Sequence, residues 1–196
     1  MTLLSRRGLL AAVAAVGAAW AGVKVRVARA VGLRPPGALP EGAFERSCIR
    51  CFRCAQVCPT QCIRFDTKGG LAELDTPFIH AAERACILCM KCGDACPTGA
   101  IQPTPHDPDI IQAKVRMGTP VLDKATCLSW SKQGICRLCY YACPYPDRAV
   151  SLVGPMLGPL FHPQACVGCG LCEEACPKLA HSIKIVPFGS GGETPT

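Results

Sequence analysis

The chain has 196 residues and a formal net charge of +7, and only 6% of its residues are aromatic. Residues 1–30 contain five of the 21 basic side chains and none of the 14 acidic ones, so the rest of the chain is nearly balanced, at 16 basic to 14 acidic. This balance excludes the broad basic surface that nucleic-acid binding requires. The length that remains after residue 30 suits one compact unit of two small modules.

The first 30 residues have the features of an export signal. Arg6 and Arg7 precede the uncharged, apolar stretch Gly8–Val23, and Ala28-Arg29-Ala30 offers a small-x-small cleavage site. Twin arginines in this position are typical of Tat export. The apolar stretch has sixteen residues, fewer than the roughly 20 that span a bilayer, so a cleaved signal is favoured over a retained anchor.

Sixteen of the seventeen cysteines fall into four runs, each of which ends in Cys-Pro. Three runs have the spacing Cys-x2-Cys-x2-Cys-x3-Cys, and the third run has eight residues between its first two cysteines. The four runs are Cys48, Cys51, Cys54 and Cys58; Cys86, Cys89, Cys92 and Cys96; Cys127, Cys136, Cys139 and Cys143; and Cys166, Cys169, Cys172 and Cys176. This is the ligand pattern of bacterial two-cluster ferredoxins, so we expect these cysteines to bind the iron of four [4Fe–4S] clusters.

The pattern allows two ways of pairing the runs. Three cysteines of one run surround a cluster, and the fourth cysteine completes the neighbouring cluster. If sequential runs pair, Cys96 joins the first run and Cys58 the second, while Cys176 joins the third and Cys143 the fourth. A nested arrangement, in which the outer runs pair and the inner runs pair, uses the same ligands, and the sequence does not choose between the two.

Two other uses of cysteine fit the spacing poorly. Structural zinc sites usually combine two separated pairs of ligands rather than runs of three plus one. A disulfide framework would not repeat cysteines three residues apart before four Cys-Pro pairs. An exported protein with sixteen unpaired thiolates also suits the Tat route, which carries proteins that have already folded around their cofactor. Because metal binding contributes folding free energy, we expect the chain without clusters to be largely unfolded.

The fold expected is α+β, with tandem ferredoxin-like modules that repeat a strand, a cluster loop, a short helix and a strand. Short apolar segments follow each run, and the segments before the third and fourth runs are also strand-like. Asp107 and Pro108 can begin a helix between the modules that Gly118 can close. The predicted divisions are an export signal at 1–30, an extended linker at 31–45, module 1 at 46–104, a linker helix at 105–120, module 2 at 121–187 and a disordered tail at 188–196.

Two residues stand apart from the ligand pattern. Cys62 is the seventeenth cysteine, at a place where the second run has Ala100, so small-residue packing beside a cluster is favoured over ligand exchange or redox sensing. Trp130 lies in the insertion of the third run, and covering local hydrophobic surface is favoured over docking.

Several segments resemble the NapG/MauM ferredoxin-type proteins. They are the leader, Cys48-Ile-Arg-Cys-Phe-Arg-Cys, Arg116-Met-Gly-Thr-Pro-Val-Leu-Asp, Cys127-Leu-Ser-Trp and Cys136-Arg-Leu-Cys-Tyr. The resemblance covers nearly the whole chain, and the regular second run brings it nearer the MauM side, because NapG-like chains lengthen that run. In this family NapG works with a membrane partner to draw electrons from quinol towards a periplasmic nitrate reductase, and MauM belongs to methylamine utilisation systems.

The function expected is electron transfer rather than catalysis. Four oxidised clusters would each add about −2, which makes the protein net negative. The expected donor is a membrane-bound ferredoxin-type or quinol-oxidising protein, and the expected acceptor is a periplasmic oxidoreductase, with no nucleic acid and no small-molecule substrate. The expected location is the periplasm, at the outer face of the cytoplasmic membrane. The alternatives are an accessory protein that matures or redox-poises a periplasmic enzyme such as an amine dehydrogenase, and a redox sensor that uses Cys62.

Overall fold

The computed structural model describes residues 32–65, 76–177 and 180–188, so the predicted export signal lies outside the described residues, as does all of the predicted tail except Phe188. In chain order the elements are α2 (Glu41–Ser47), α3 (Arg53–Gln56), β1 (Ile63–Phe65), β2 (Pro77–Ile79), α4 (Lys91–Asp94), α5 (Pro108–Lys114), β3 (Gly118–Leu122), α6 (Leu138–Ala142), β4 (Val150–Val153), β5 (Gly158–Phe161), α7 (Leu171–Glu174) and β6 (Ile183–Pro187). In these ranges no helix is both long and apolar enough to cross a membrane.

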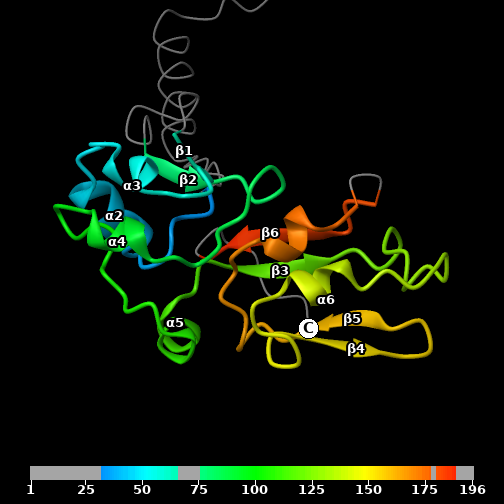
Figure 1. Ribbon diagram of the computed structural model, residues 1–196. Helices are drawn as coiled ribbons and strands as arrows, with labels where there is room; N and C mark the ends of the chain where they lie inside the picture. The colour runs from blue at the N-terminus through cyan, green and yellow to red at the C-terminus, as the bar shows by residue number, and fades with distance from the viewer. Residues whose placement is uncertain (1–31, 66–75, 178–179, 189–196) are drawn as a thin grey trace, which may run out of the picture.

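The two halves of the chain repeat one plan, in which an outer strand pair brackets an inner hairpin (Figure 1). In the second half, β3 pairs antiparallel with β6 as the outer pair, and β4 pairs antiparallel with β5 as the hairpin. In the first half, β1 and β2 form the hairpin, and the outer pair is reduced to a bridge between Ala38 and Ile101. The repetition seen in the cysteine runs is therefore also present in the backbone.

Residues 32–45 pack against the first module, although the sequence suggests an extended linker there. Leu33 is buried and bridges to Ile79. Arg34 makes an ion pair with Glu41 and donates to the carbonyl oxygen of Pro77 at 2.9 Å. The prolines suppress regular hydrogen bonding along the segment, but the buried leucine and the paired arginine hold it against the hairpin.

The structure has a helix, α5, after the second cysteine run, and it ends earlier than the glycine signal suggests. The Asp107 carboxylate caps α5 by accepting from the backbone N–H groups of Asp109 and Ile110, both at 3.0 Å, and Pro108 occupies the first turn. The helix stops at Lys114, and Val115 is already extended. Gly118 opens β3 instead of closing the helix. Glycine is needed there because a Cβ would lie 2.6 Å from the Val186 carbonyl oxygen of the paired strand.

The two modules share one hydrophobic core. The contact between them is made by backbone groups and small side chains. The N–H of Cys86 donates to the carbonyl oxygen of Cys169 at 3.0 Å, and the N–H of Ala85 donates to the Glu174 carboxylate at 2.9 Å. Gly170 lies so close to Ala81 that a Cβ at this glycine would be 2.4 Å from the Cβ of Ala81. This close approach brings a cysteine loop of each module into direct contact.

Candidate iron–sulfur sites

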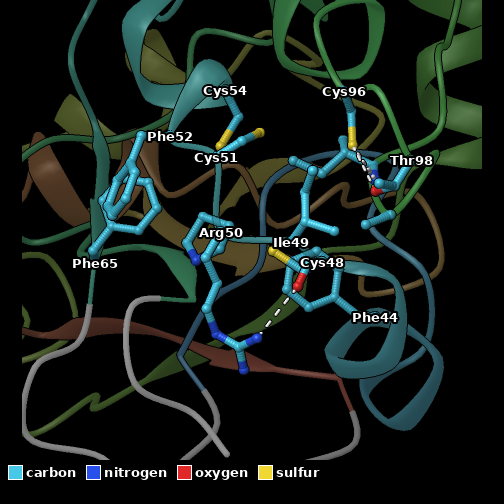
Figure 2. Close-up of a pocket in the computed structure, with 13 residues that line it drawn as sticks. Phe44, Cys48, Ile49, Arg50, Cys51, Phe52, Cys54, Phe65, Cys96 and Thr98 are labelled. Carbon is cyan, nitrogen blue, oxygen red and sulfur yellow. Dashed lines mark hydrogen bonds between the residues drawn. The ribbon is translucent and has the colours of Figure 1, made fainter.

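The first three cysteines of run one and the last cysteine of run two surround one cavity. This group, called site 1, consists of Cys48, Cys51, Cys54 and Cys96. Phe44, Phe65 and Ile101 form part of the apolar wall of this cavity, which is open to solvent on one side. Figure 2 shows the labelled cysteines around this space, with Phe52 packed against Phe65 at a ring-centroid distance of 4.4 Å.

The second module contains two equivalent cavities. Site 3 consists of Cys127, Cys136, Cys139 and Cys176, and site 4 consists of Cys143, Cys166, Cys169 and Cys172. Each again combines three cysteines of one run with the last cysteine of its sequential neighbour. Of the two pairings that the sequence left open, the structure therefore brings together the cysteines of the sequential one.

The remaining cysteines of the first module form site 2, which consists of Cys58, Cys86, Cys89 and Cys92. Cys62 lies within this group. Its Sγ is 3.6 Å from the Sγ of Cys58, and hydrogen bonding to Cys62, followed by burial, raises the pKa of Cys86. Burial, followed by the neighbouring Cys89 thiolate, raises the pKa of Cys92 to about 12. The extra cysteine is thus a fifth sulfur beside four potential ligands.

Each cysteine loop has a residue at positive φ directly after the cysteine that precedes its helix. These residues are Phe52, Met90, Arg137 and Gly170, with φ of 62°, 57°, 60° and 88°. In the three regular loops the residue two positions earlier also has positive φ, namely Arg50, Leu88 and Gly168. Such alternation makes a backbone nest, in which successive N–H groups point towards a common centre and favour an anion there.

Backbone N–H groups also reach the cysteine sulfurs directly. The N–H of Leu88 donates to Cys86 Sγ, that of Gly168 to Cys166 Sγ, and that of Ile101 to Cys96 Sγ, each at 3.4 Å. Hydrogen bonds to sulfur are among the means by which proteins set the reduction potential of an iron–sulfur cluster. The loops thus provide both thiolate ligands and the N–H donors that stabilise negative charge on them.

Burial keeps several of these thiols protonated when no metal is bound. It raises the pKa of Cys54 to about 11, with smaller contributions from the Cys48, Cys51 and Cys96 thiolates. It raises the pKa of Cys139 to about 12, with contributions from Cys127, Cys136 and Cys176. The group at site 1 and the group at site 3 are therefore electrostatically coupled sets of thiols, which a cationic cluster core would neutralise.

The donor set fits a [4Fe–4S] cluster at each site. At sites 1, 3 and 4 the four cysteines line the walls of a common hollow. A zinc site would instead place four ligands within about 2.3 Å of one point. At site 3, two buried donors, Arg137 Nε and Ser182 Oγ, have no hydrogen-bond partner among the described residues, and both residues line the cavity.

Contacts between the sites give them a linear order. Sites 1 and 2 are adjacent because α3, which carries Cys54, packs against α4, which carries Cys92. The hydrogen bond from Cys86 to Cys169 joins site 2 to site 4. Sites 4 and 3 are adjacent because α7, which carries Cys172, packs against α6, which carries Cys139. The order is therefore site 1, site 2, site 4 and site 3, which differs from the order of the runs along the chain.

Sequence reasoning did not identify Ser182 or Arg137 as site residues, and it treated the insertion of the third run only as local cover. Trp130 does cover β5, because its indole N–H donates to the Pro159 carbonyl oxygen at 3.0 Å and its ring packs against Gly158. The Ser129 hydroxyl accepts from the backbone N–H of Cys136 at 3.2 Å. The insertion thus positions the second cysteine of site 3.

Comparison with known proteins agrees with these sites. A family model described as a 4Fe–4S dicluster domain matches residues 47–100 and 85–146, and one described as a 4Fe–4S binding domain matches residues 159–180. The fold and the cysteine-lined cavities therefore define the chain as a ferredoxin-type iron–sulfur protein, with a role in electron transfer.

Similar curated proteins identify the family. The chain is 37% identical over 190 residues to the ferredoxin-type protein NapG of Escherichia coli, an alignment that covers 89% of this chain and 79% of the relative. It is 39% identical over 178 residues to the methylamine utilization ferredoxin-type protein MauM of Methylorubrum extorquens, covering 84% and 78%. The MauM protein of Paracoccus denitrificans is 35% identical over 174 residues, covering 82% and 74%. The chain belongs to the NapG/MauM ferredoxin-type family, and these identities do not separate its two branches.

Proposed function

We propose that this protein is a Tat-exported electron carrier with four [4Fe–4S] clusters, one held by the cysteines of each of sites 1 to 4. It receives electrons from a membrane-bound ferredoxin-type or quinol-oxidising protein and delivers them to a periplasmic oxidoreductase. The cleaved leader leaves the folded protein in the periplasm, at the outer face of the cytoplasmic membrane. The relatives named for methylamine utilization suggest an amine-oxidising system as one setting for the acceptor.

The observation that carries this proposal is the unbroken series of sites. Sites 1 and 2 are packed together through α3 and α4, sites 3 and 4 through α6 and α7, and the Cys86–Cys169 hydrogen bond connects the two pairs. A bound cluster accepts and releases single electrons. The protein's own residues hold the clusters in series, exclude water from them through buried apolar walls, and donate hydrogen bonds to sulfur.

The two end sites have exposed apolar and basic residues that suit transient docking of redox partners. Beside site 1, Ile49 is 61% exposed and Phe52 is 43% exposed, next to the exposed Arg53. Beside site 3, Tyr141 is 66% exposed and Ile135 is 53% exposed. Aromatic residues, arginine and exposed apolar side chains are typical of interfaces. Electrons therefore enter at one of these ends and leave at the other.

A direct test uses the anaerobically reconstituted protein without its leader, mixed with membranes of the source organism and a reduced quinol analogue. Bleaching of the cluster absorbance that requires both membranes and quinol is the expected result. If intact clusters that dithionite can reduce do not bleach, the accessory role in maturation or redox poising is favoured. Fewer than about three clusters per chain after anaerobic purification would also contradict the proposal, because a missing cluster interrupts the series.

Single-cysteine variants test the proposed ligand sets. In the sequential pairing, Cys96→Ala and Cys51→Ala abolish the EPR signal of the same cluster, whereas Cys58→Ala affects a different one. In the nested pairing, Cys96 serves the third run, and Cys96→Ala and Cys51→Ala abolish different signals. Analysis of iron content in each variant checks that only one cluster is lost.

A further inference from the structure

One small, buried residue follows each cysteine run at the same structural place, directly before the residue that opens the next strand or bridge. We call this place the pre-strand position. Its occupants are Cys62, Ala100, Ala149 and Ser182, which are 3%, 1%, 2% and 3% exposed. The residues that they precede are Ile63 in β1, Ile101 in the bridge to Ala38, Val150 in β4 and Ile183 in β6.

Each of the four sites has one pre-strand residue beside it. That residue comes from the same run as the last cysteine of the site. Ala100 lines site 1, Ala149 lines site 4, and Ser182 lines site 3. Cys62 lies 3.6 Å from Cys58, sulfur to sulfur, in site 2. The four sites are therefore built alike at this position, except for the chemical group that the side chain presents.

The group presented differs in its ability to donate a hydrogen bond. Ala100 and Ala149 present only a methyl group, and the Cys62 sulfur is already paired with the Cys58 sulfur at 3.6 Å. The Ser182 hydroxyl is a full donor, and it is buried without a partner among the described residues. A buried polar group left without a partner destabilises the folded protein. Because Ser182 lines the site 3 cavity, a sulfur atom of the group bound there is the acceptor that satisfies it.

A second unpartnered donor supports the same assignment. Arg137 Nε is buried without a partner among the described residues, and Arg137 lines the same cavity. Its guanidinium carries a permanent positive charge. Site 3 therefore combines a neutral donor from the residue before β6 with a cationic donor from the loop before α6. The corresponding loop residues of the other sites are Phe52, Met90 and Gly170, none of which has a side-chain N–H or O–H donor.

We propose that the pre-strand position grades the reduction potentials of the four clusters, and that Ser182, together with Arg137, makes the site 3 cluster the most easily reduced. This inference rests on the proposed function, since it requires bound clusters. Reduction adds one electron and one negative charge to a cluster, and hydrogen bonds and positive charge near its sulfurs stabilise the reduced form. Ser182 keeps its proton throughout, so the step is electron transfer alone.

The grading gives the series of clusters a direction. Site 3 is one end of the order site 1, site 2, site 4 and site 3, and the most easily reduced cluster at that end collects electrons. Electrons therefore enter at site 1 and leave at site 3, where the acceptor docks beside Ile135 and Tyr141.

The test is an anaerobic redox titration of the holoprotein followed by EPR. In Ser182→Ala we expect the highest of the four midpoint potentials to fall by the equivalent of about a tenfold change in the reduction equilibrium constant, which is about 59 mV for one electron. The other three stay unchanged. Ala100→Ser is the reciprocal variant, because it places a hydroxyl on site 1, and we expect it to raise one of the lower potentials.

Other outcomes overturn the inference. It is wrong if Ser182→Ala retains four clusters with unchanged potentials, if all four potentials move together, or if a potential other than the highest moves. Should Ser182→Ala lose a cluster, Ala100→Ser decides, and an unchanged set of potentials in that variant rejects the grading. A wild-type protein with fewer clusters contradicts the proposed function itself, so the two failures are distinguishable.

Discussion

Individual residues in the cysteine loops adopt positive φ for two different reasons. Phe52, Met90 and Arg137 have side chains, and holding such residues in this conformation costs about 1 kcal/mol or more each. In the loops of Phe52 and Met90 the N–H groups of the backbone nest favour an anion, which offsets part of this cost when a cluster is bound. Gly170 has the same conformation, but there the contact with Ala81 leaves no room for a side chain. The glycine of the fourth loop thus allows the two modules to pack closely against each other.

Gly170→Ala is expected to loosen this joint. An added Cβ would lie 2.4 Å from the Cβ of Ala81 and 3.5 Å from that of Ala85. The positive φ costs about 1 kcal/mol for alanine, and overpacking adds about 1–3 kcal/mol. Thermal unfolding of the holoprotein should shift to lower temperature, and electron exchange between the two modules should slow, because sites 2 and 4 meet at this contact.

Gly154→Ala is the matched control for this variant. Gly154 also has a positive φ, of 72°, but nothing lies within 4 Å of the place where its Cβ would be. Gly154→Ala should lower the stability only by the cost of a positive φ for alanine, and it should leave electron exchange between the modules unchanged. Equal destabilisation by the two variants would show that the Gly170 contact with Ala81 has no role in joining the modules.

The raised thiol pKa values predict proton release when clusters are assembled. In the folded chain without metal, burial raises the pKa of Cys54 to about 11 and that of Cys169 to about 12, from 9.0. A raised pKa favours the protonated thiol wherever the cysteine is buried, and in an unfolded chain without metal the same thiols, with a pKa near 9, are also mostly protonated at neutral pH. Iron requires thiolates, so assembly must displace these protons.

Anaerobic reconstitution in weak buffer should therefore acidify the solution, and the yield of clusters should rise from pH 7 to pH 8.5. Proton release is measured by pH-stat titration against the iron incorporated. A pH-independent yield with no acidification would show that the buried cysteines are already ionised before iron binds.

At the scale of elements, the helices that carry cysteines are too short to be stable alone. The helices α3, α4 and α7 have four residues each and α6 has five, whereas isolated helices need roughly 12–15 residues. The described strands have at most five residues. These elements therefore depend on what lies between them, which at sites 1 to 4 is the bound cluster.

Removal of iron should unfold both modules together. We expect an iron chelator under reducing conditions to abolish most of the far-UV circular dichroism in parallel with the loss of cluster absorbance. The parallel follows because cluster binding and folding are thermodynamically linked. Retention of the full spectrum after iron removal would mean that the hydrophobic core alone stabilises the fold.

The helix between the modules offers a test that does not involve a cluster. Asp107→Ala removes the acceptor for two backbone N–H groups of α5, and loss of such a cap costs about 1 kcal/mol. Asp107→Asn keeps a capping oxygen and should be nearly neutral. Denaturant unfolding of the holoproteins compares them, and equal stability of Asp107→Ala and wild type would show that the cap makes no net contribution.

Local sequence signals identified some elements well and missed others, for physical reasons. The capping pair at residues 107–108 and the β-branched residues of β4 and β6 are strong local signals: α5 begins at this pair, and β4 and β6 follow the third and fourth cysteine runs. The packing of residues 32–45 depends on Leu33 reaching Ile79, a contact between residues far apart in the chain. Sequence reasoning missed Ser182 for the same reason. A lone serine gives no local signal, and only the fold places it with Cys176 around the site 3 cavity.

At the scale of the whole molecule, the order of the sites follows from how the modules join. The runs give four ligand sets, and the contact of Cys86 with Cys169, with the close approach of Gly170 to Ala81, places sites 2 and 4 at the centre. No periodicity in the chain records this contact, because it involves backbone atoms. The order leaves site 1 and site 3 at opposite ends of the series, so donor and acceptor are expected to dock at separate surfaces.

Charge reversal at each end tests this separation. Arg53 is exposed beside site 1, and Lys132 is exposed in the insertion of site 3. Surface charges of this kind act mainly on the association rate and are screened by salt. In stopped-flow measurements at low ionic strength, Arg53→Glu should slow electron exchange with one partner and Lys132→Glu should slow it with the other. Both effects should disappear at about 1 M salt, because the Debye length there is only about 3 Å. If both variants slow the same partner, one surface serves donor and acceptor, and the series does not conduct from end to end.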